Sequence, residues 1–235
     1  LALAREKTGD AALQLSDLRQ DEDVLDTWFS SWLWPISVFD GIRFPDNREI
    51  NYYYPTNDLV TAPDIIFFWV ARMIFSGIEH TGKVPFHDVL IHGIIRDEQG
   101  RKMSKSLGNG IMPDEIIQQY GADILRLWVA SSDYHSDIRI SKAILQQLSD
   151  AYKKIRNTAR YILGNLGNGA GFNPDTDMVS DDQLHELDRW ALIRLDRLID
   201  KVHEGYTNFD FHVVFHSIHN FCTTDMSNFY LDIIK

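Results

Sequence analysis

Runs of apolar residues in the first half of the chain predict a mixture of helix and strand. Residues Pro63–Glu79 are apolar almost all round, which predicts a helix buried on all faces and ending before Gly82. The short apolar run Val89–Ile95 predicts a strand of a parallel sheet covered on both faces. The aromatic run Ile50–Pro55 predicts a further strand.

The second half of the chain carries helical periodicity. Five helices are predicted, over residues 113–119, 122–130, 141–166, 183–204 and 211–234. Ser141 is a suitable N-cap for the third of them. Residues 164–182 are rich in Gly, Asn and Asp and predict an exposed loop. Because no strand pattern follows residue 141, we place a domain boundary near residue 142.

Composition narrows the class of protein. The 235 residues are 44% hydrophobic and 24% charged, as in globular proteins generally, and no apolar run is long enough to cross a bilayer. The first residues, starting at Leu1, lack a signal-peptide layout and resemble the interior of a longer protein. A single cysteine, Cys222, excludes an internal disulfide framework and a CxxC zinc site. We expect a cytoplasmic location and no membrane partner.

The formal net charge of −11 bears on nucleic-acid binding. General nucleic-acid binders are more often basic, because they neutralise phosphates. If RNA is a partner, it must contact local basic stretches.

The most informative such stretch runs from Arg101 to Asn109, with the sequence RKMSKSLGN. The ammonium groups of Lys102 and Lys105 are compact charges suited to phosphate oxygens. Glycine and serine leave backbone N–H groups free to approach an anion. A solvated basic loop is the ordinary interpretation of such a cluster.

A second dense stretch, residues 23–35, reads DVLDTWFSSWLWP and has three tryptophans within seven residues. These rings form either a structural aromatic cluster or the wall of an apolar pocket. Pro35 is expected to end any helix here.

These motifs resemble a known family. Lys102–Ser106 spells KMSKS, the second signature of class I aminoacyl-tRNA synthetases. DVLDTWFSS and LWPIS resemble valyl-tRNA synthetases, whereas GADILRLWVASSDY, KIRNTARYILGNL and NFYLDIIK resemble isoleucyl-tRNA synthetases. The chain is thus valyl-like in its first half and isoleucyl-like in its second, which indicates an unusual branch or two joined genes.

The resemblance implies an α/β fold: the second half of a Rossmann-like parallel-sheet catalytic domain, followed by an all-α helical-bundle anticodon-binding domain. The resemblance implies three parts. Residues 1–22 would be a connector at the exit of the inserted editing domain, and residues 23–141 would be the catalytic half with the KMSKS loop. Residues 142–235 would be the start of the helical domain. The first class I signature, HIGH, does not occur among the nine histidines. We therefore expect this chain alone to lack aminoacylation activity.

The resemblance also assigns residues to roles. Lys102 and Lys105 would be catalytic, stabilising pyrophosphate charge with help from Mg²⁺, and the protein itself is assigned no metal ligand. Trp28 and Trp69 would line the amino-acid pocket. The implied ATP-binding residues are Asp64, His92, Gly93, Lys102, Met103, Ser104, Lys105 and Ser106. Asp64 would contact the adenosine ribose, although Ala62 replaces the glycine of the family's Gly-x-Asp. A lone strand histidine such as His92 is more often a hydrogen-bonded core residue.

The function implied is ATP-dependent attachment of valine to its tRNA through an aminoacyl-adenylate, by a monomeric parent enzyme. Isoleucine is the alternative amino acid. A rival of another class is a non-catalytic helical module that binds tRNA or protein, for which residues 142–235 alone would suffice. A nucleotidyltransferase of the same fold is a further rival, against which the aromatic WFSS pocket argues.

Overall fold

The computed structural model describes residues 1–166 and 171–234. The chain divides into two compact units, Leu1–Leu90 and Ile91–Lys235. The predicted domain boundary near residue 142 falls inside the second unit. There one hydrophobic cluster joins Trp128 and Ile140 to Leu145, so residues on both sides of position 142 share a core.

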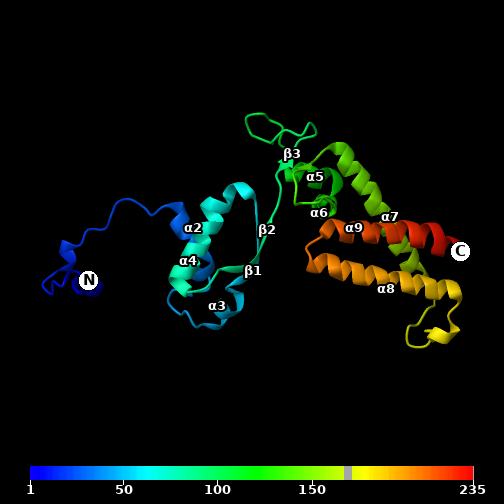
Figure 1. Cartoon of the computed structure of the whole chain (residues 1–235), viewed down its shortest axis with the longest axis horizontal. Helices are drawn as coiled ribbons and strands as arrows, with labels where there is room; N and C mark the ends of the chain where they lie inside the picture. Colours follow the sequence, from blue (N-terminus) through cyan, green and yellow to red (C-terminus); the bar gives the residue numbers. More distant parts are fainter. Residues whose placement is uncertain (167–170, 235) are drawn as a thin grey trace. The chain divides into compact units, whose positions relative to one another are not determined.

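The first unit is mainly helical (Figure 1). Its helices are α1 (Ala2–Thr8), α2 (Thr27–Ser37), α3 (Arg48–Tyr53) and α4 (Ala71–Thr81), with short 3₁₀ turns η1 (Leu15–Asp17) and η2 (Pro63–Ile65) and a π-helical turn η3 (Ile66–Val70). Strands β1 (Thr56–Thr61) and β2 (Phe86–Ile91) form a two-stranded sheet.

Three predictions for this unit are wrong. The predicted strand Ile50–Pro55 is largely helix α3. The side-chain Oδ1 of Asn47 accepts hydrogen bonds from the N–H groups of Glu49 and Ile50, at 2.9 and 3.0 Å, and so starts a helix. Ile50 and Tyr54, one turn apart, then pack with Ile36, and this burial outweighs the β propensity of the tyrosines. In addition, α2 passes through Pro35 and ends two residues later, at Ser37.

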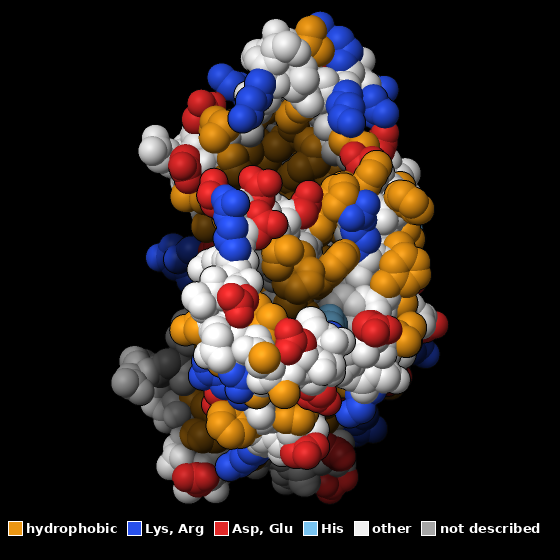
Figure 2. All heavy atoms as spheres, turned by 90° about the vertical axis from the view of Figure 1, so that its left-hand side faces the viewer, with side chains coloured by type: hydrophobic (Ala, Val, Ile, Leu, Met, Phe, Trp, Pro, Cys, Tyr) orange, Lys and Arg blue, Asp and Glu red, His pale blue; other side chains and the backbone are white. Residues whose placement is uncertain are grey.

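The third error concerns burial. The predicted helix from Pro63 exists as the succession of η2, η3 and α4, and Gly82 caps it as expected. It is not buried on all faces, because α2 covers one side while Phe67 and Phe75 remain 74% and 68% exposed. Figure 2 shows hydrophobic side chains over much of the face turned toward the viewer. A further prediction, the strand Val89–Ile95, spans both units and is wrong in part. Strand β2 ends at Ile91, the next strand begins at Ile95, and Val89 is exposed.

The second unit begins with a pair of very short strands. Strand β3 (Ile95–Arg96) pairs in parallel with β4 (Ile138–Arg139), in the register Ile95 to Ile138 and Arg96 to Arg139. The parallel pairing that the fold prediction requires is therefore present here, although β4 lies between the predicted helices 122–130 and 141–166, where sequence analysis assigns no strand. Between the two strands lie α5 (Pro113–Tyr120) and α6 (Ala122–Ser131), close to their predicted bounds.

Long helices make up the rest of the second unit. They are α7 (Lys142–Leu166), α8 (Glu186–Thr207), α9 (Phe211–Asn220) and α10 (Leu231–Ile233), with a 3₁₀ turn η4 (Asp181–Gln183) and a π-helical segment η5 (Phe221–Tyr230). Ser141 caps α7 as predicted, since the Ile144 N–H donates to its Oγ at 3.2 Å. Part of the loop predicted at 164–182 falls on residues 167–170, which lie outside the described residues. None of the described helices is long and apolar enough to span a membrane.

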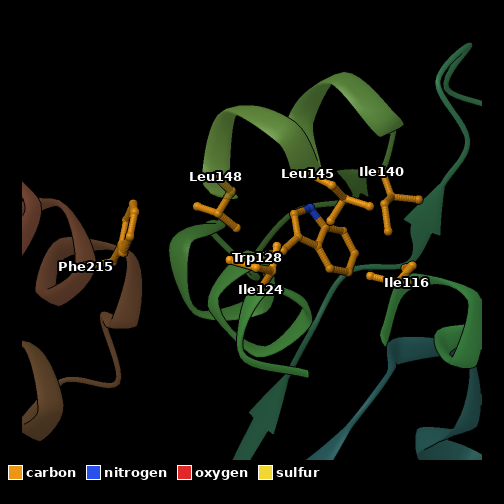
Figure 3. Packing of buried hydrophobic residues seen from close by; sticks show 7 residues of the cluster. All are labelled: Ile116, Ile124, Trp128, Ile140, Leu145, Leu148 and Phe215. Atoms are coloured by element: carbon orange, nitrogen blue, oxygen red, sulfur yellow. The ribbon is translucent and has the colours of Figure 1, made fainter. Parts of the chain in front are cut away.

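The main core lies where α5, α6, α7 and α9 meet (Figure 3). Trp128 on α6 and Leu145 on α7 are 3% and 1% exposed, and Figure 3 shows them side by side with Ile140 above Ile116. Burying each such side chain stabilises the fold by about 1.5–3 kcal/mol. This core supports the loop that connects β3 to α5.

Candidate active-site loop and aromatic pocket

The KMSKS residues lie on the loop between β3 and α5. Asp97 begins a tight turn, in which its N–H donates to the Arg101 carbonyl at 3.0 Å and the Gly100 N–H donates back to the Asp97 carbonyl at 2.9 Å. The turn is continued by an antiparallel bridge between Arg96 and Lys102. The strand end therefore sets where the loop starts.

The Asn109 side chain closes this loop. Its Nδ2 donates to Asp97 Oδ2 at 2.8 Å and to the Lys102 carbonyl at 3.3 Å. Its Oδ1 accepts from the Ser104 N–H at 3.0 Å. One amide thus joins the turn before the motif to two points of the motif backbone. We call this arrangement of Asn109, Asp97, Lys102 and Ser104 the loop clip.

Asp97 is the buried anchor of the loop clip, with 6% of its surface exposed. The Asn109 amide, followed by the backbone N–H and the guanidinium of Arg101, lowers the pKa of this carboxyl to about 2. The Arg101 N–H and Nε each donate to it at 2.8 Å. Asp97 is therefore ionised at neutral pH and is held from two directions.

Within the loop, side chains divide into anchors and free groups. Met103 is half-buried and packs against the main core. The Ser104 Oγ accepts from the Leu107 N–H at 3.2 Å and lies 3.1 Å from the Ser106 Oγ. Lys102 and Lys105 are exposed, and neither ammonium group forms a hydrogen bond or a close ion pair in the described part of the chain, although the charge of Lys102 also acts on the Asp137 carboxylate. The backbone is thus fixed while both ammonium groups remain available.

His92 and Gly93 lie in the same unit, just before β3. Gly93 allows a close approach of two backbones, because a Cβ there would lie 2.2 Å from the carbonyl of Ser136. Its N–H donates to the Tyr134 carbonyl at 2.7 Å. The half-buried His92 has its Nδ1 2.8 Å from the Gly93 carbonyl. A carbonyl can only accept, so Nδ1 carries a hydrogen and donates it to this carbonyl.

The pairing of β3 with β4 is secured by Asp137. Its carboxylate accepts from the Ile94 N–H at 2.7 Å and forms an ion pair with Arg96. The backbone hydrogen bond and the guanidinium lower the pKa of this carboxyl. Asp137 therefore fixes residues 94–96, which lead into the loop, through both a backbone and a side-chain contact.

The two predicted pocket tryptophans contact each other in the first unit. The rings of Trp28 on α2 and Trp69 in η3 meet edge to face at 6.4 Å. Phe68 stacks against Trp28 at 5.9 Å, and the Arg72 guanidinium lies 3.4 Å from the centre of the Trp28 ring. A cation over an indole face is attracted by its quadrupole. Phe68 and Arg72, one turn apart, therefore hold the Trp28 ring.

Asp64 lies in the 3₁₀ turn η2, in the same unit, and is exposed. The preceding Ala62 has φ −110° and ψ 155°, an extended conformation that any residue adopts. The backbone at the position of the family's glycine therefore accommodates alanine. Whether Asp64 contacts a ribose stays a prediction.

The structure thus brings the predicted residues together as two groups: the tryptophans and Asp64 in the first unit, and His92, Gly93 and the loop in the second. Sequence analysis does not single out Asp97, Asn109, Phe68 or Arg72. Within the described residues, no group of three His, Cys, Asp or Glu side chains is placed to hold a metal ion. Mg²⁺ is commonly held by one or two carboxylates together with substrate phosphates, so how it would bind here stays a prediction.

Comparison with known proteins places these two groups in a family. The sequence profile of "tRNA synthetases class I (I, L, M and V)" matches residues 3–141, and that of "Anticodon-binding domain of tRNA ligase" matches residues 188–235. The isoleucine–tRNA ligase of Syntrophotalea carbinolica is 47% identical over 93% of the chain and 22% of its own length. The valine–tRNA ligase of Bacteroides fragilis is 48% identical over the whole chain and 26% of its own length. The chain spans about a quarter of the length of these relatives.

Solved structures confirm the fold. LeuRS of Agrobacterium radiobacter K84, in a ternary complex with tRNA and LeuAMS, matches with a TM-score of 0.71 at 20% identity, over 97% of this chain and 31% of that one. Methionyl-tRNA synthetase of Mycobacterium tuberculosis bound by methionyl-adenylate matches with a TM-score of 0.63 at 21% identity, over 88% of this chain and 39% of that one. The predicted fold class, a Rossmann-like catalytic part with a helical anticodon-binding part, is confirmed. Since the first profile covers more than half of the residues and includes the KMSKS loop, the chain belongs to the class I tRNA synthetases.

Proposed function

We propose that this chain is part of an ATP-dependent synthetase that attaches valine to its tRNA through an aminoacyl-adenylate. The observation that carries the proposal is the loop, which fixes its backbone through Asn109 and presents Lys102 and Lys105 without a close ion pair or hydrogen bond among the described residues. Two unpaired ammonium groups on a fixed backbone suit the charge of a pyrophosphate leaving group. Positioned charge of this kind is the main contribution a protein makes to phosphoryl chemistry.

In the proposed reaction a carboxylate oxygen of the amino acid attacks the α-phosphorus of ATP. The bond to the bridging oxygen breaks and pyrophosphate leaves, its developing negative charge stabilised by Lys102 and Lys105. A ribose hydroxyl at the end of the tRNA then attacks the aminoacyl carbonyl and AMP leaves. Little covalent chemistry is required of the protein, so rates should depend on how firmly the loop is held.

The nucleotide would be oriented by residues other than the two lysines. The His92 ring, whose Nδ1 contacts the Gly93 carbonyl, would contact the adenine. Asp64 would accept from the ribose hydroxyls. Met103 and Ser104, held against the core and by the Asn109 amide, would contact the adenine side through their backbone.

The amino-acid side chain would be bound by Trp28 and Trp69, whose edge-to-face contact forms an apolar surface. These residues belong to the valyl-like part of the sequence, which favours valine. Isoleucine is the second candidate, supported by an isoleucine–tRNA ligase relative of nearly the same identity. We also propose tRNA as the partner of the helical part, on the match of residues 188–235 to an anticodon-binding domain. The monomeric parent and the cytoplasmic location stay predictions.

The test uses a chimera in which this chain replaces the aligned segment of a full-length valine–tRNA ligase. ATP–pyrophosphate exchange is measured with valine and with isoleucine. We expect the chimera to prefer valine, since one methylene changes binding by about 1–3 kcal/mol, or roughly 10- to 200-fold. That magnitude is the general one known for isoleucyl- and valyl-tRNA synthetases themselves, and it does not come from the geometry of this pocket.

The variant Lys105→Ala in the same chimera tests whether the loop lysine acts in the chemical step. It should lower kcat for exchange more than it changes KM for the amino acid, because the charge it removes is needed mainly in the transition state. Preference for isoleucine would shift the assignment to the second candidate. Exchange unaffected by Lys105→Ala would refute the proposed role of the loop.

A further inference from the structure

A cavity of about 470 Å³ in the second unit lies away from the loop, among α8, α9 and η5. Basic side chains dominate its lining. Helix α8 contributes Arg194, Arg197 and Lys201, and α9 contributes His212 and His216. Figure 1 shows α8 and α9 lying side by side as an antiparallel pair.

The two helices are held close by their connection. A Cβ at Gly205 would lie 2.6 Å from the side chain of Val214, so glycine is needed for this approach. The Asp210 N–H donates to the Gly205 carbonyl at 2.7 Å and fixes the turn. The walls of the cavity are therefore set by the backbone and do not depend on a ligand.

The charges in the cavity do not cancel. Asp225 on η5 is the one carboxylate among its lining residues in the described part of the chain, and it is paired with Arg194. The guanidinium Nε and Nη2 donate to Asp225 Oδ2 at 3.1 and 2.9 Å. Arg197 and Lys201, four residues apart on α8, have no ion-pair partner among the described residues. Two positive charges remain in excess, on a chain whose net charge is −11.

The histidines on the facing helix add hydrogen-bonding capacity. The Nδ1 of His212 is buried and has no hydrogen-bond partner among the described residues. Partial burial, together with His212 and His219, lowers the pKa of the His216 imidazole, so this ring is neutral at pH 7. His212 Nδ1 itself has no exposed surface, but both histidines line the cavity, and an imidazole has a second ring nitrogen that can hydrogen-bond a ligand.

We propose that this cavity binds a phosphate group, with Arg197 and Lys201 supplying the charge and His212 and His216 supplying hydrogen bonds. Guanidinium groups match phosphate oxygens in pairs, and lysine adds a compact charge. The phosphate has two possible sources, which share this chemistry: free inorganic phosphate, or a phosphodiester of an RNA backbone. For an RNA ligand the inference rests on the proposed tRNA partner of residues 188–235, which include every residue of the cavity. It does not rest on the proposed chemistry of aminoacylation, because the cavity shares no residue with the loop or the aromatic pocket.

The test titrates the 235-residue chain with inorganic phosphate at constant ionic strength, with chloride as the reference anion. The readout is the NMR signal of the His212 and His216 ring protons, assigned with His212→Gln and His216→Gln. We expect saturable shifts with phosphate that chloride does not reproduce. Arg197→Gln combined with Lys201→Gln should weaken binding about tenfold or more, because it removes two charge-assisted contacts.

The matched control is Arg156→Gln with Arg160→Gln, which removes the same charge from two exposed positions four residues apart on α7. This pair should leave the phosphate shifts unchanged. Equal weakening in both double variants, or histidine signals that do not respond to phosphate or RNA, would overturn the proposal.

A second arm identifies the source. A short single-stranded RNA is titrated in place of phosphate at several salt concentrations. If a phosphodiester occupies the cavity, RNA shifts the same two histidines, and the slope of log K against log salt becomes shallower by about 0.7 in the Arg197/Lys201 double variant. If inorganic phosphate shifts the histidines and RNA does not, free phosphate is the ligand and the proposal stands in that form.

Discussion

The loop clip makes a quantitative prediction, because one side chain carries most of it. In Asn109→Ala the loop loses two hydrogen bonds to its own backbone, one from the Ser104 N–H at 3.0 Å and one to the Lys102 carbonyl at 3.3 Å. Each is worth about 0.5–1.5 kcal/mol in a folded protein. Their loss favours an open loop by about 1–3 kcal/mol, or roughly 5- to 150-fold. The bond from Asn109 to Asp97 acts in the same direction.

Limited trypsin digestion measures this opening directly. The loop carries its own cleavage sites, after Arg101, Lys102 and Lys105. When opening and closing are fast, the cleavage rate follows the population of the open form. Asn109→Ala should therefore be cut within the loop at least about fivefold faster than the unchanged chain.

Two further variants sharpen the test. Asn157→Ala removes an exposed asparagine of α7 and should leave the loop cleavage rate unchanged. Asn109→Asp keeps an acceptor for the Ser104 N–H but places a second carboxylate beside Asp97, so it should open the loop as well. In the chimeric enzyme both Asn109 variants should lower kcat for pyrophosphate exchange. Loop cleavage at the rate of the Asn157→Ala control would refute the role given to Asn109.

Two other predictions follow from neighbouring contacts. Gly93→Ala places a Cβ 2.2 Å from the Ser136 backbone and should lower the free energy of unfolding by about 1–3 kcal/mol in urea denaturation, whereas Gly164→Ala, in open space on α7, should not lower it. A stable Gly93→Ala variant would contradict the close packing of the two backbones. The pKa of Asp97, about 2, lies below its ordinary value of 3.8, so its contribution to stability is complete above pH 4 and is lost as the pH falls through about 2. Asn109→Ala should raise this pKa toward 3.8, as measured by NMR titration of the Asp97 side chain, and an unchanged pKa would show that Arg101 alone is responsible.

The parts of the fold that sequence analysis predicts well are those with local causes. Helix α7 follows from a cap at Ser141 and a regular apolar period, and both act between residues close in sequence. The KMSKS loop is recognised by its resemblance to a family signature, because its residue types alone are those of an ordinary solvated basic loop. The resemblance assigns Trp28 and Trp69 to one pocket, and their rings do meet.

The errors have causes that lie outside the local pattern. Ile50–Pro55 has β propensity, but the Asn47 cap and the packing of Tyr54 against Ile36 select a helix. The exposure of Phe67 could not be predicted from the sequence. An all-apolar pattern indicates that burial of the helix is favourable, but it does not indicate which other elements cover the helix. The π-helical turn η3 leaves no periodic mark over five residues.

The loop clip escapes sequence analysis for a related reason. Asp97 and Asn109 are twelve residues apart, and each is of a type that is common in turns. Their contact depends on the loop folding back on itself, which no periodic pattern records. The structure reveals such a pair, because a buried carboxylate needs hydrogen-bond donors and Asn109 is one of those that Asp97 has.

The arrangement of the loop explains how an acidic chain can present positive charge where the proposed chemistry needs it. A lysine paired in the resting protein would have to give up its partner before it met a phosphate, and that exchange would cancel much of the benefit. Here the Asp97 carboxylate at the start of the loop is already held by Asn109 and Arg101, and among the described residues it forms no ion pair with Lys102 or Lys105. The same hydrogen bonds fix the backbone from which both lysines extend. Asn109 therefore acts in two ways, holding the loop closed and occupying the carboxylate of Asp97, and alanine at position 109 would remove both effects.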